Sequence, residues 1–217
     1  MGGEKMVEIL YTRFYENLPK KRWNNFLSEL PKYVQEKIMR YRKWQDRLAS
    51  LYGRVIIQRA LTAHGYNKHC LENLSITEYG KPFIDDNVYF NLSHSGEYVV
   101  CSVSEKGRVG IDIEKVRPIV LSHYQKIIPP KKWKEIIWSD EKEQLFYDYW
   151  TMIESALKAD GRGFSLPIED IIMNGHEVIL YDKTWFITKV NIDHHYCCNL
   201  ATTISDPVIS VSEVRID

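Results

Sequence analysis

The stretch Val109-Gly-Ile-Asp-Ile-Glu114 alternates apolar and acidic residues, which is the pattern of a β-strand whose two faces meet different surroundings. In such a strand Asp112 and Glu114 lie on one face, and the valine and isoleucines lie on the other. Two carboxylates a few ångströms apart repel each other and resist desolvation, so a cation or a shared proton must stabilise the pair. The stretch therefore predicts a strand beside a magnesium site, although a solvent-facing edge strand would carry the same pattern.

A further carboxylate lies in Trp150-Thr-Met-Ile-Glu-Ser-Ala-Leu-Lys158, where apolar residues recur at helical spacing. Glu154 and Lys158 are four residues apart and so share one face of the helix. As an exposed pair they would stabilise the helix by only about 0.2–0.5 kcal/mol, and this alternative stays open. Beside the acidic strand, however, Glu154 would add a hard oxygen ligand and Lys158 a cation that faces a phosphate.

Composition excludes several classes of protein. The chain has 217 residues, 44% hydrophobic and 27% charged, as in an ordinary globular protein. Lys and Arg number 29, and so do Asp and Glu, so no net charge favours a nucleic-acid partner. No stretch approaches the roughly 20 apolar residues of a membrane span, and the N-terminus lacks the apolar core of a signal peptide. These features predict a cytoplasmic protein with no membrane partner and with its four cysteines reduced.

Hydrophobic periodicity predicts helices and strands in both halves of the chain. Helices are expected over residues 22–30, 43–64, 121–128 and 131–138, and from a start near Asp140, whose side chain would cap the helix of Glu154. Strands are expected over residues 7–11, 74–77, 88–92, 98–104, 109–114, 177–181, 184–191, 196–203 and 208–211. Ser93 and His94 would then occupy a loop after a strand. The predicted class is α+β, with an N-terminal half over residues 1–106 and a C-terminal half over 107–217 that carries the magnesium site.

Four motifs occur in an order that resembles one enzyme family. They are Gly80-Lys-Pro82, Phe90-Asn-Leu-Ser-His-Ser95, Gly110-Ile-Asp-Ile-Glu114 and the stretch from Trp150 to Lys158, followed by Gly161-Arg-Gly-Phe-Ser-Leu-Pro167. Together they resemble the 4′-phosphopantetheinyl transferases, in the longer single-chain type named after the surfactin-synthetase-activating enzyme. The resemblance implies two similar α/β subdomains with pseudo-twofold symmetry and a cofactor cleft between them. Two halves on one chain also imply a monomer.

The implied reaction transfers the 4′-phosphopantetheine arm of coenzyme A to a serine of an apo acyl or peptidyl carrier protein. It depends on magnesium and releases 3′,5′-adenosine bisphosphate. Carrier proteins of fatty acid or secondary metabolite biosynthesis are the implied partners. Two rivals remain: a magnesium-dependent phosphohydrolase that acts on coenzyme A or a nucleotide diphosphate, and a catalytically weak module that only binds carrier proteins.

The motif match also implies roles for individual residues. Asp112 and Glu114 would bind magnesium, and Glu154 would be a third ligand or the base that takes the serine proton. Lys158 would meet the phosphates. The implied coenzyme A contacts are Ser93 and His94 on the 3′-phosphate, Lys81 at the nucleotide end, and Lys37 and Arg40 near the same phosphate. A structural histidine and a solvated helix face are the alternatives for His94 and for the last two residues.

One residue departs from the family pattern. The family usually has Lys-Glu where this chain has Ile153-Glu154, so a cation is lost beside the expected site. Ile153 falls on the apolar stripe of the predicted helix. The departure bears on the rate, the affinity for coenzyme A and the choice of acceptor.

The segment between the acidic strand and this helix combines apolar and basic residues. The apolar residues are Ile127, Ile128, Trp133, Ile136, Ile137 and Trp138, and the basic ones are Lys126, Lys131, Lys132 and Lys134. Such a surface would complement an acidic carrier protein that has an apolar patch. Core packing of amphipathic helices is the alternative.

Residues 194–198 hold two histidines and two cysteines, all of them potential zinc ligands. Strand alternation sends these neighbours to opposite faces, unlike a tetrahedral arrangement.

Overall fold

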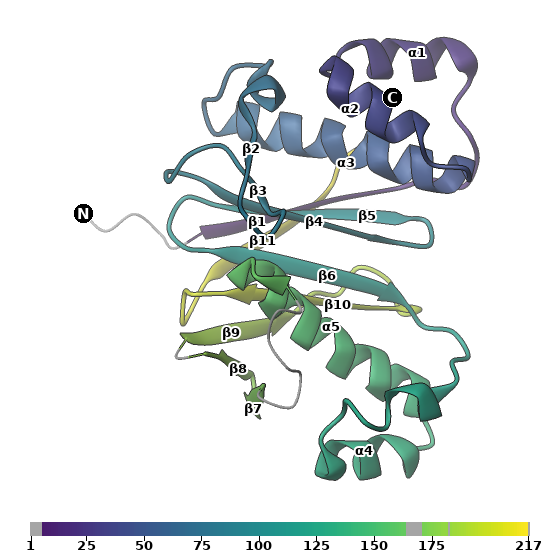
Figure 1. Ribbon diagram of the computed structural model, residues 1–217, viewed down its shortest axis with the longest axis vertical. Coiled ribbons are helices and arrows are strands. Elements are labelled where there is room, and N and C mark those ends of the chain that lie inside the picture. Colours follow the sequence, from purple (N-terminus) through teal and green to yellow (C-terminus); the bar gives the residue numbers. More distant parts are fainter. Residues whose placement is uncertain (1–5, 164–170, 182, 217) are drawn as a thin grey trace.

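The computed structural model describes residues 6–163, 171–181 and 183–216, and these form two main β-sheets with helices on their outer sides (Figure 1). The first sheet has the strand order β11-β1-β5-β4, and the second has the order β6-β10-β9-β8-β7. The first sheet contains β1 (Met6–Arg13), β4 (Tyr89–Ser95), β5 (Tyr98–Ser104) and β11 (Val208–Glu213). The second contains β6 (Val109–Lys115), β7 (Ile172–Asn174), β8 (Glu177–Leu180), β9 (Lys183–Lys189) and β10 (Tyr196–Thr202). Strands β2 (Ser75–Ile76) and β3 (Pro82–Phe83) form a separate hairpin.

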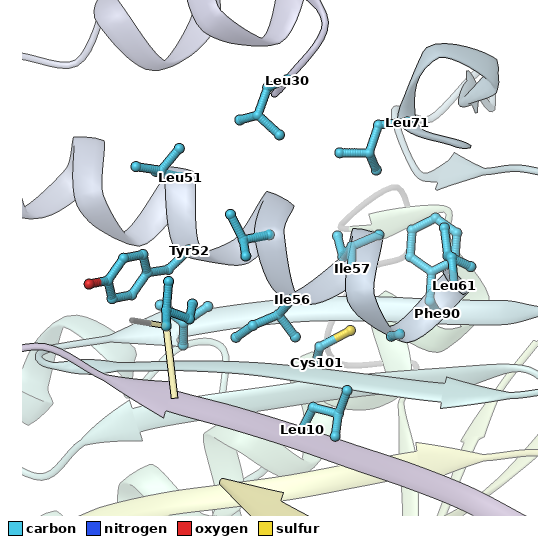
Figure 2. Close-up of a cluster of buried hydrophobic side chains, with 14 of the residues drawn as sticks. Leu10, Leu30, Leu51, Tyr52, Ile56, Ile57, Leu61, Leu71, Phe90 and Cys101 are labelled. Atoms are coloured by element: carbon cyan, nitrogen blue, oxygen red, sulfur yellow. The ribbon is translucent and has the colours of Figure 1, made fainter. Parts of the chain in front are cut away.

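Helices cover the outer face of each sheet. The first half supplies α1 (Lys20–Ser28), α2 (Lys32–Met39), α3 (Trp44–Ala63) and the 3-10 helix η1 (Cys70–Asn73). The second half supplies the 3-10 helix η2 (Leu121–Tyr124), α4 (Pro130–Ile137) and α5 (Lys142–Asp160). Figure 2 shows how α3 packs on the first sheet, with Ile56 and Leu61 above the strand residues Leu10 and Cys101. Helix α5 packs in the same way on β6 and β10 of the second sheet.

Strand alternation produces a third apolar layer between the two sheets. In β1, Leu10 faces the helices while Val7 and Ile9 face the second sheet. In β10, Cys197 faces α5 and Cys198 faces the first sheet, so the neighbouring thiols lie on opposite faces as the alternation predicted. The molecule is thus layered helix, sheet, sheet, helix, and this arrangement confirms the α+β class.

The same alternation in β6 places the acidic residues under α5. Its valine and isoleucines belong to the apolar layer between the sheets. The opposite face carries Gly110 and Asp112 and meets α5, where a Cβ on Gly110 would lie 2.1 Å from the Ser155 carbonyl oxygen and 2.3 Å from the Ala159 nitrogen. Only glycine permits this approach of strand to helix backbone.

Several predicted element boundaries were wrong. Residues 121–128 form only the short η2, which ends at Tyr124. Helix α5 begins at Lys142 without a side-chain cap, and Ser139 Oγ rather than Asp140 accepts a nearby backbone N–H, that of Glu141. Strand β4 continues to Ser95, so Ser93 and His94 lie within the strand and not in a loop. Helix α2 was not predicted.

The chain connections bear on the expected halves. Strands β5 and β6, on either side of residues 106 and 107, belong to different sheets. Strand β11 returns to the first sheet and pairs parallel with β1, so a division at this point leaves one C-terminal strand with the N-terminal half. We propose that the chain consists of the halves 1–106 and 107–217, with β11 of the second half added to the sheet of the first. The layered arrangement supports a pseudo-twofold relation between these halves. None of the helices in the described residues is long and apolar enough to cross a membrane.

Replacing Gly110 tests the strand-to-helix contact. Gly110→Ala should lower the free energy of unfolding by about 3 kcal/mol, because the new methyl group overlaps backbone atoms of α5 that cannot rotate away. Urea denaturation followed by circular dichroism measures the loss. Gly175→Ala is the control: its φ is +62° with open space around it, so only backbone strain of about 1 kcal/mol is expected. Equal losses in both variants would contradict the contact.

Candidate active site

Polar side chains of β4 join the two sheets at their edges. Alternate residues of β4 present side-chain oxygens, and alternate residues of β6 donate their backbone N–H groups to them. The bonds run from Ile111 N to Asn91 Oδ1 (3.0 Å), from Ile113 N to Ser93 Oγ (3.3 Å) and from Lys115 N to Ser95 Oγ (3.1 Å). The Phe90–Ser95 motif is therefore held against the acidic strand along its length.

The two serines of this seam also orient the carboxylates of β6. Ser93 Oγ donates to Asp112 Oδ1 at 2.8 Å, and Ser95 Oγ donates to Glu114 Oε2 at 2.7 Å. A hydroxyl can accept one hydrogen bond while it donates another, so each serine fixes a backbone N–H and a carboxylate at once.

Lys158 of α5 completes the cluster. Its Nζ lies 2.5 Å from Asp112 Oδ1, donates to Ser93 Oγ at 3.0 Å and lies 3.8 Å from Glu154 Oε2. The side chain of Asp112 is only 2% exposed, whereas that of Lys158 is 30% exposed. Among the described residues, Asp112 Oδ2 is buried and has no hydrogen-bond partner. The structure thus brings three of the predicted residues, Ser93, Asp112 and Glu154, around the ammonium of a fourth, Lys158.

The other two carboxylates of the cluster, Glu114 and Glu154, are also partly buried and lie near the charge of Asp112. Burial, opposed by the Ser95 hydrogen bond and reinforced by the charge of Asp112, raises the pKa of Glu114. Burial, followed by the charge of Asp112, also raises the pKa of Glu154. Within residues 6–163, 171–181 and 183–216, no three acidic, histidine or cysteine side chains converge with the geometry of a preformed metal site. The Lys158 ammonium and the charge of Arg117 beside Glu114 together balance two of these three carboxylates, so negative charge is in excess here.

A pocket of about 300 Å³ opens beside this cluster. Its walls come from both halves of the chain: residues 79–82 of the Gly-Lys-Pro loop, Asn91 and Leu92 of β4, and Glu154, Leu157 and Lys158 of α5. Glu154 and Lys158 thus border a space that a ligand could enter, while Asp112 lies behind them.

Lys81 belongs to the loop that lines this pocket, but its ammonium group binds backbone carbonyl oxygens of α5 and β6. The ammonium donates to the carbonyl oxygens of Lys158 at 2.6 Å, of Ala159 at 2.9 Å and of Val109 at 3.4 Å. It is therefore engaged at the end of α5 and the start of β6.

The other predicted coenzyme A contacts lie further out. His94 is exposed on the opposite face of β4 from Ser93, and partial desolvation followed by the charge of Lys158 lowers its pKa. Lys37 and Arg40 lie at the exposed end of α2, which packs on α3. Their contacts with coenzyme A stay predictions.

Asn91 and Ser95 are functional residues that the sequence motifs did not single out. Both fall in the quoted Phe90–Ser95 motif, and polar residues at positions 91, 93 and 95 repeat with the period of a strand. That period was a usable signal that three side chains share one face.

Removing the Lys158 ammonium should destabilise the fold. In Lys158→Met the buried Asp112 carboxylate keeps only the Ser93 hydroxyl as a side-chain donor among the described residues, so the free energy of unfolding should fall by about 3 kcal/mol. Urea denaturation in magnesium-free buffer measures it, and Asp112→Asn combined with Lys158→Met should recover part of the loss. A loss below about 1 kcal/mol, as for exposed ion pairs, would show that the contact is not buried as described.

Fold and site define a two-sheet α+β protein with an acidic, lysine-containing pocket. Comparison with known proteins identifies the family. A family model described as "4'-phosphopantetheinyl transferase, N-terminal" matches residues 18–106, and one described as "4'-phosphopantetheinyl transferase superfamily" matches residues 108–211. The 4′-phosphopantetheinyl transferase Sfp of Bacillus subtilis (strain 168) is 32% identical over 70% of this chain and 69% of its own length.

Two further relatives cover more of the chain. The 4′-phosphopantetheinyl transferase gsp of Aneurinibacillus migulanus is 29% identical over 97% of this chain and 92% of its own length. Another 4′-phosphopantetheinyl transferase of Bacillus subtilis is 34% identical over 75% of this chain and 77% of its own length. The chain belongs to the 4′-phosphopantetheinyl transferase superfamily, so the resemblance predicted from the motifs is confirmed.

Proposed function

We propose that this chain transfers the 4′-phosphopantetheine arm of coenzyme A to a serine of an apo acyl or peptidyl carrier protein. In this reaction the serine Oγ bonds to the phosphorus of the arm, the phosphorus–oxygen bond to 3′,5′-adenosine bisphosphate breaks, and the serine proton passes to a base. The observation that carries the proposal is the pairing of Glu154 and Lys158, at the wall of a pocket that both halves build, with the buried Asp112 behind them.

The residues of the cluster fit a magnesium ion. Asp112 Oδ2 is a buried carboxylate oxygen without a partner among the described residues. Glu114 and Glu154 are neighbouring carboxylates that burial makes costly to ionise without a cation. Magnesium prefers such oxygen ligands and, when bound, would neutralise the pyrophosphate of coenzyme A. We therefore assign Asp112, Glu114 and Glu154 as the ligand set, with Lys158 turning toward a phosphate.

Glu154 has two possible roles in this proposal, as a third ligand or as the base. Its raised pKa makes it a stronger proton acceptor, which suits a base that works near neutral pH. Lys158 is only four residues away on the same helix face, and its 30% exposure lets the ammonium reach the pocket. There it would offset charge on the departing oxygen.

Coenzyme A would lie along the pocket between the halves. The backbone and stem of Lys81 in the Gly-Lys-Pro loop would contact its nucleotide end, whereas the ammonium is engaged elsewhere. Ser93 and His94 would meet the 3′-phosphate, with Lys37 and Arg40 as further cations. A cytoplasmic monomer without a nucleic-acid or membrane partner completes the proposal.

The carrier protein would bind at a smaller platform than the sequence predicted. Ile128 and Ile136 are buried in the core under α5, so they cannot form part of a binding surface. Ile137 and Trp138 are exposed, Trp138 by 79%. Lys126, Lys131 and Lys134 of the same segment are also exposed, and Lys132 is paired with Glu135 at 2.9 Å. An apolar anchor within a basic rim suits an acidic carrier protein.

The position of Ile153 supports activity over the weak binding module. Ile153 is fully buried in the core beneath α5. A lysine there would have to leave that core, so the isoleucine improves packing without removing Glu154 or Lys158 from the pocket.

The direct test incubates the chain with coenzyme A, magnesium and a panel of apo carrier proteins, and follows intact carrier mass. We expect one added arm on at least one carrier and none after chelation with EDTA. Glu154→Gln should lower the rate by about 10²- to 10⁴-fold, because it removes a carboxylate that acts as base or ligand. Coenzyme A consumed without any acceptor would instead identify a phosphohydrolase, and binding without modification would identify the carrier-binding module.

Trp138→Ala tests the platform. It should raise the KM for the carrier protein by about tenfold, the effect of losing roughly 1.4 kcal/mol of binding, while kcat changes little. Tyr15→Ala, which truncates an exposed aromatic residue (68%) outside the platform, is the control and should leave both constants unchanged. An unchanged KM in Trp138→Ala would place the carrier protein on another surface.

A further inference from the structure

Lys81 is a half-buried lysine whose ammonium contacts only backbone carbonyl oxygens among the described residues. Its acceptors are the carbonyl oxygens of Lys158 and Ala159 in the last turn of α5 and of Val109 at the start of β6. An ammonium has three hydrogens, and three acceptors use them all. A phosphate would have to displace one of these bonds to gain a donor from Lys81.

These contacts complete the C-terminal cap of α5. The last four carbonyls of a helix have no partner within the helix. Gly161, in the left-handed conformation with φ +95°, donates its N–H to the Leu157 carbonyl at 2.9 Å. Lys81 then supplies donors for the next two carbonyls, and its positive charge lies at the negative end of the helix dipole.

The lysine is closely packed at this position. A Cβ on Gly161 would lie 2.9 Å from Lys81 Cδ. Burial, followed by the charge of Arg108, lowers the pKa of Lys81 to about 8, so most molecules keep the ammonium protonated at pH 7. Val109 precedes Gly110, where the β6 and α5 backbones are too close for a Cβ, so one ammonium bridges the strand and the helix beside that contact.

We propose that Lys81 is a positioning residue for the transfer reaction, because it fixes the last turn of α5 against β6 and so sets the direction of the Lys158 side chain. This inference rests on the proposed function. Lys158 carries both the carbonyl that Lys81 binds and the ammonium that contacts Ser93 and Asp112. Any shift of this turn therefore moves the cation relative to the carboxylates.

Lys81→Met keeps the length of the side chain and removes its donors. We expect kcat to fall on the order of 10²-fold, as for a misplacement of about 1 Å at a reacting centre, while the KM for coenzyme A stays close to that of the unchanged chain. Amide hydrogen exchange in the last turn of α5 should become faster, since its carbonyl cap is lost. Exchange is measured on the full chain and does not depend on activity.

A matched pair of glycines gives an independent perturbation. Gly161→Ala crowds the Lys81 stem and strains the cap, whereas Gly175→Ala has a similar positive φ of +62° with nothing within 4 Å of the new methyl group. Gly161→Ala should reproduce the fall in kcat and the faster exchange, and Gly175→Ala should show neither.

A higher KM for coenzyme A in Lys81→Met with kcat retained would overturn the inference and make Lys81 a nucleotide contact. Unchanged exchange in the last turn of α5 would overturn it as well. If the unchanged chain modifies no carrier protein, the proposed function fails, and the exchange result still decides whether Lys81 holds the helix end.

Discussion

Side chains of β4 that hydrogen-bond to the backbone of β6 are the constraint on which the rest of the site depends. The two strands lie at the edges of different sheets, and their connection runs through Asn91, Ser93 and Ser95. Because each serine also donates to a carboxylate, the bonds that join the sheets aim Asp112 and Glu114. The contacts that hold the two sheets together therefore also orient the acidic residues.

The cluster of carboxylates between β4, β6 and α5 destabilises the protein without a ligand, and the same charges would bind a cationic ligand. Three carboxylates, of which Asp112 is buried, outnumber the nearby cations Lys158 and Arg117, and the packing of β6 against α5 must offset the cost of the excess negative charge. A divalent cation and a pyrophosphate would relieve that imbalance. The same surroundings that raise the pKa of Glu154 would make it an effective proton acceptor, so instability without ligand and activity with ligand have one physical origin.

Local periodicity predicted much of the site. Period two placed Asp112 and Glu114 on one strand face, and a spacing of four placed Glu154 beside Lys158, while the ordered motifs identified the family. Contacts between distant segments were beyond such reasoning. The cap that Lys81 provides connects it with Lys158 and Ala159, which lie 77 and 78 positions further along the chain. The return of β11 to the first sheet depends on its pairing with β1. Neither leaves a pattern within one element.

The central claim is that the carboxylates of β6 and α5 bind a divalent ion together with coenzyme A. Electron paramagnetic resonance of Mn²⁺ titrated with the full chain and coenzyme A tests it most directly. We expect bound manganese with the unchanged chain and much weaker binding with Asp112→Asn, which removes the charge of the buried ligand. Equal manganese binding by the two proteins, or no binding by either, would contradict the account.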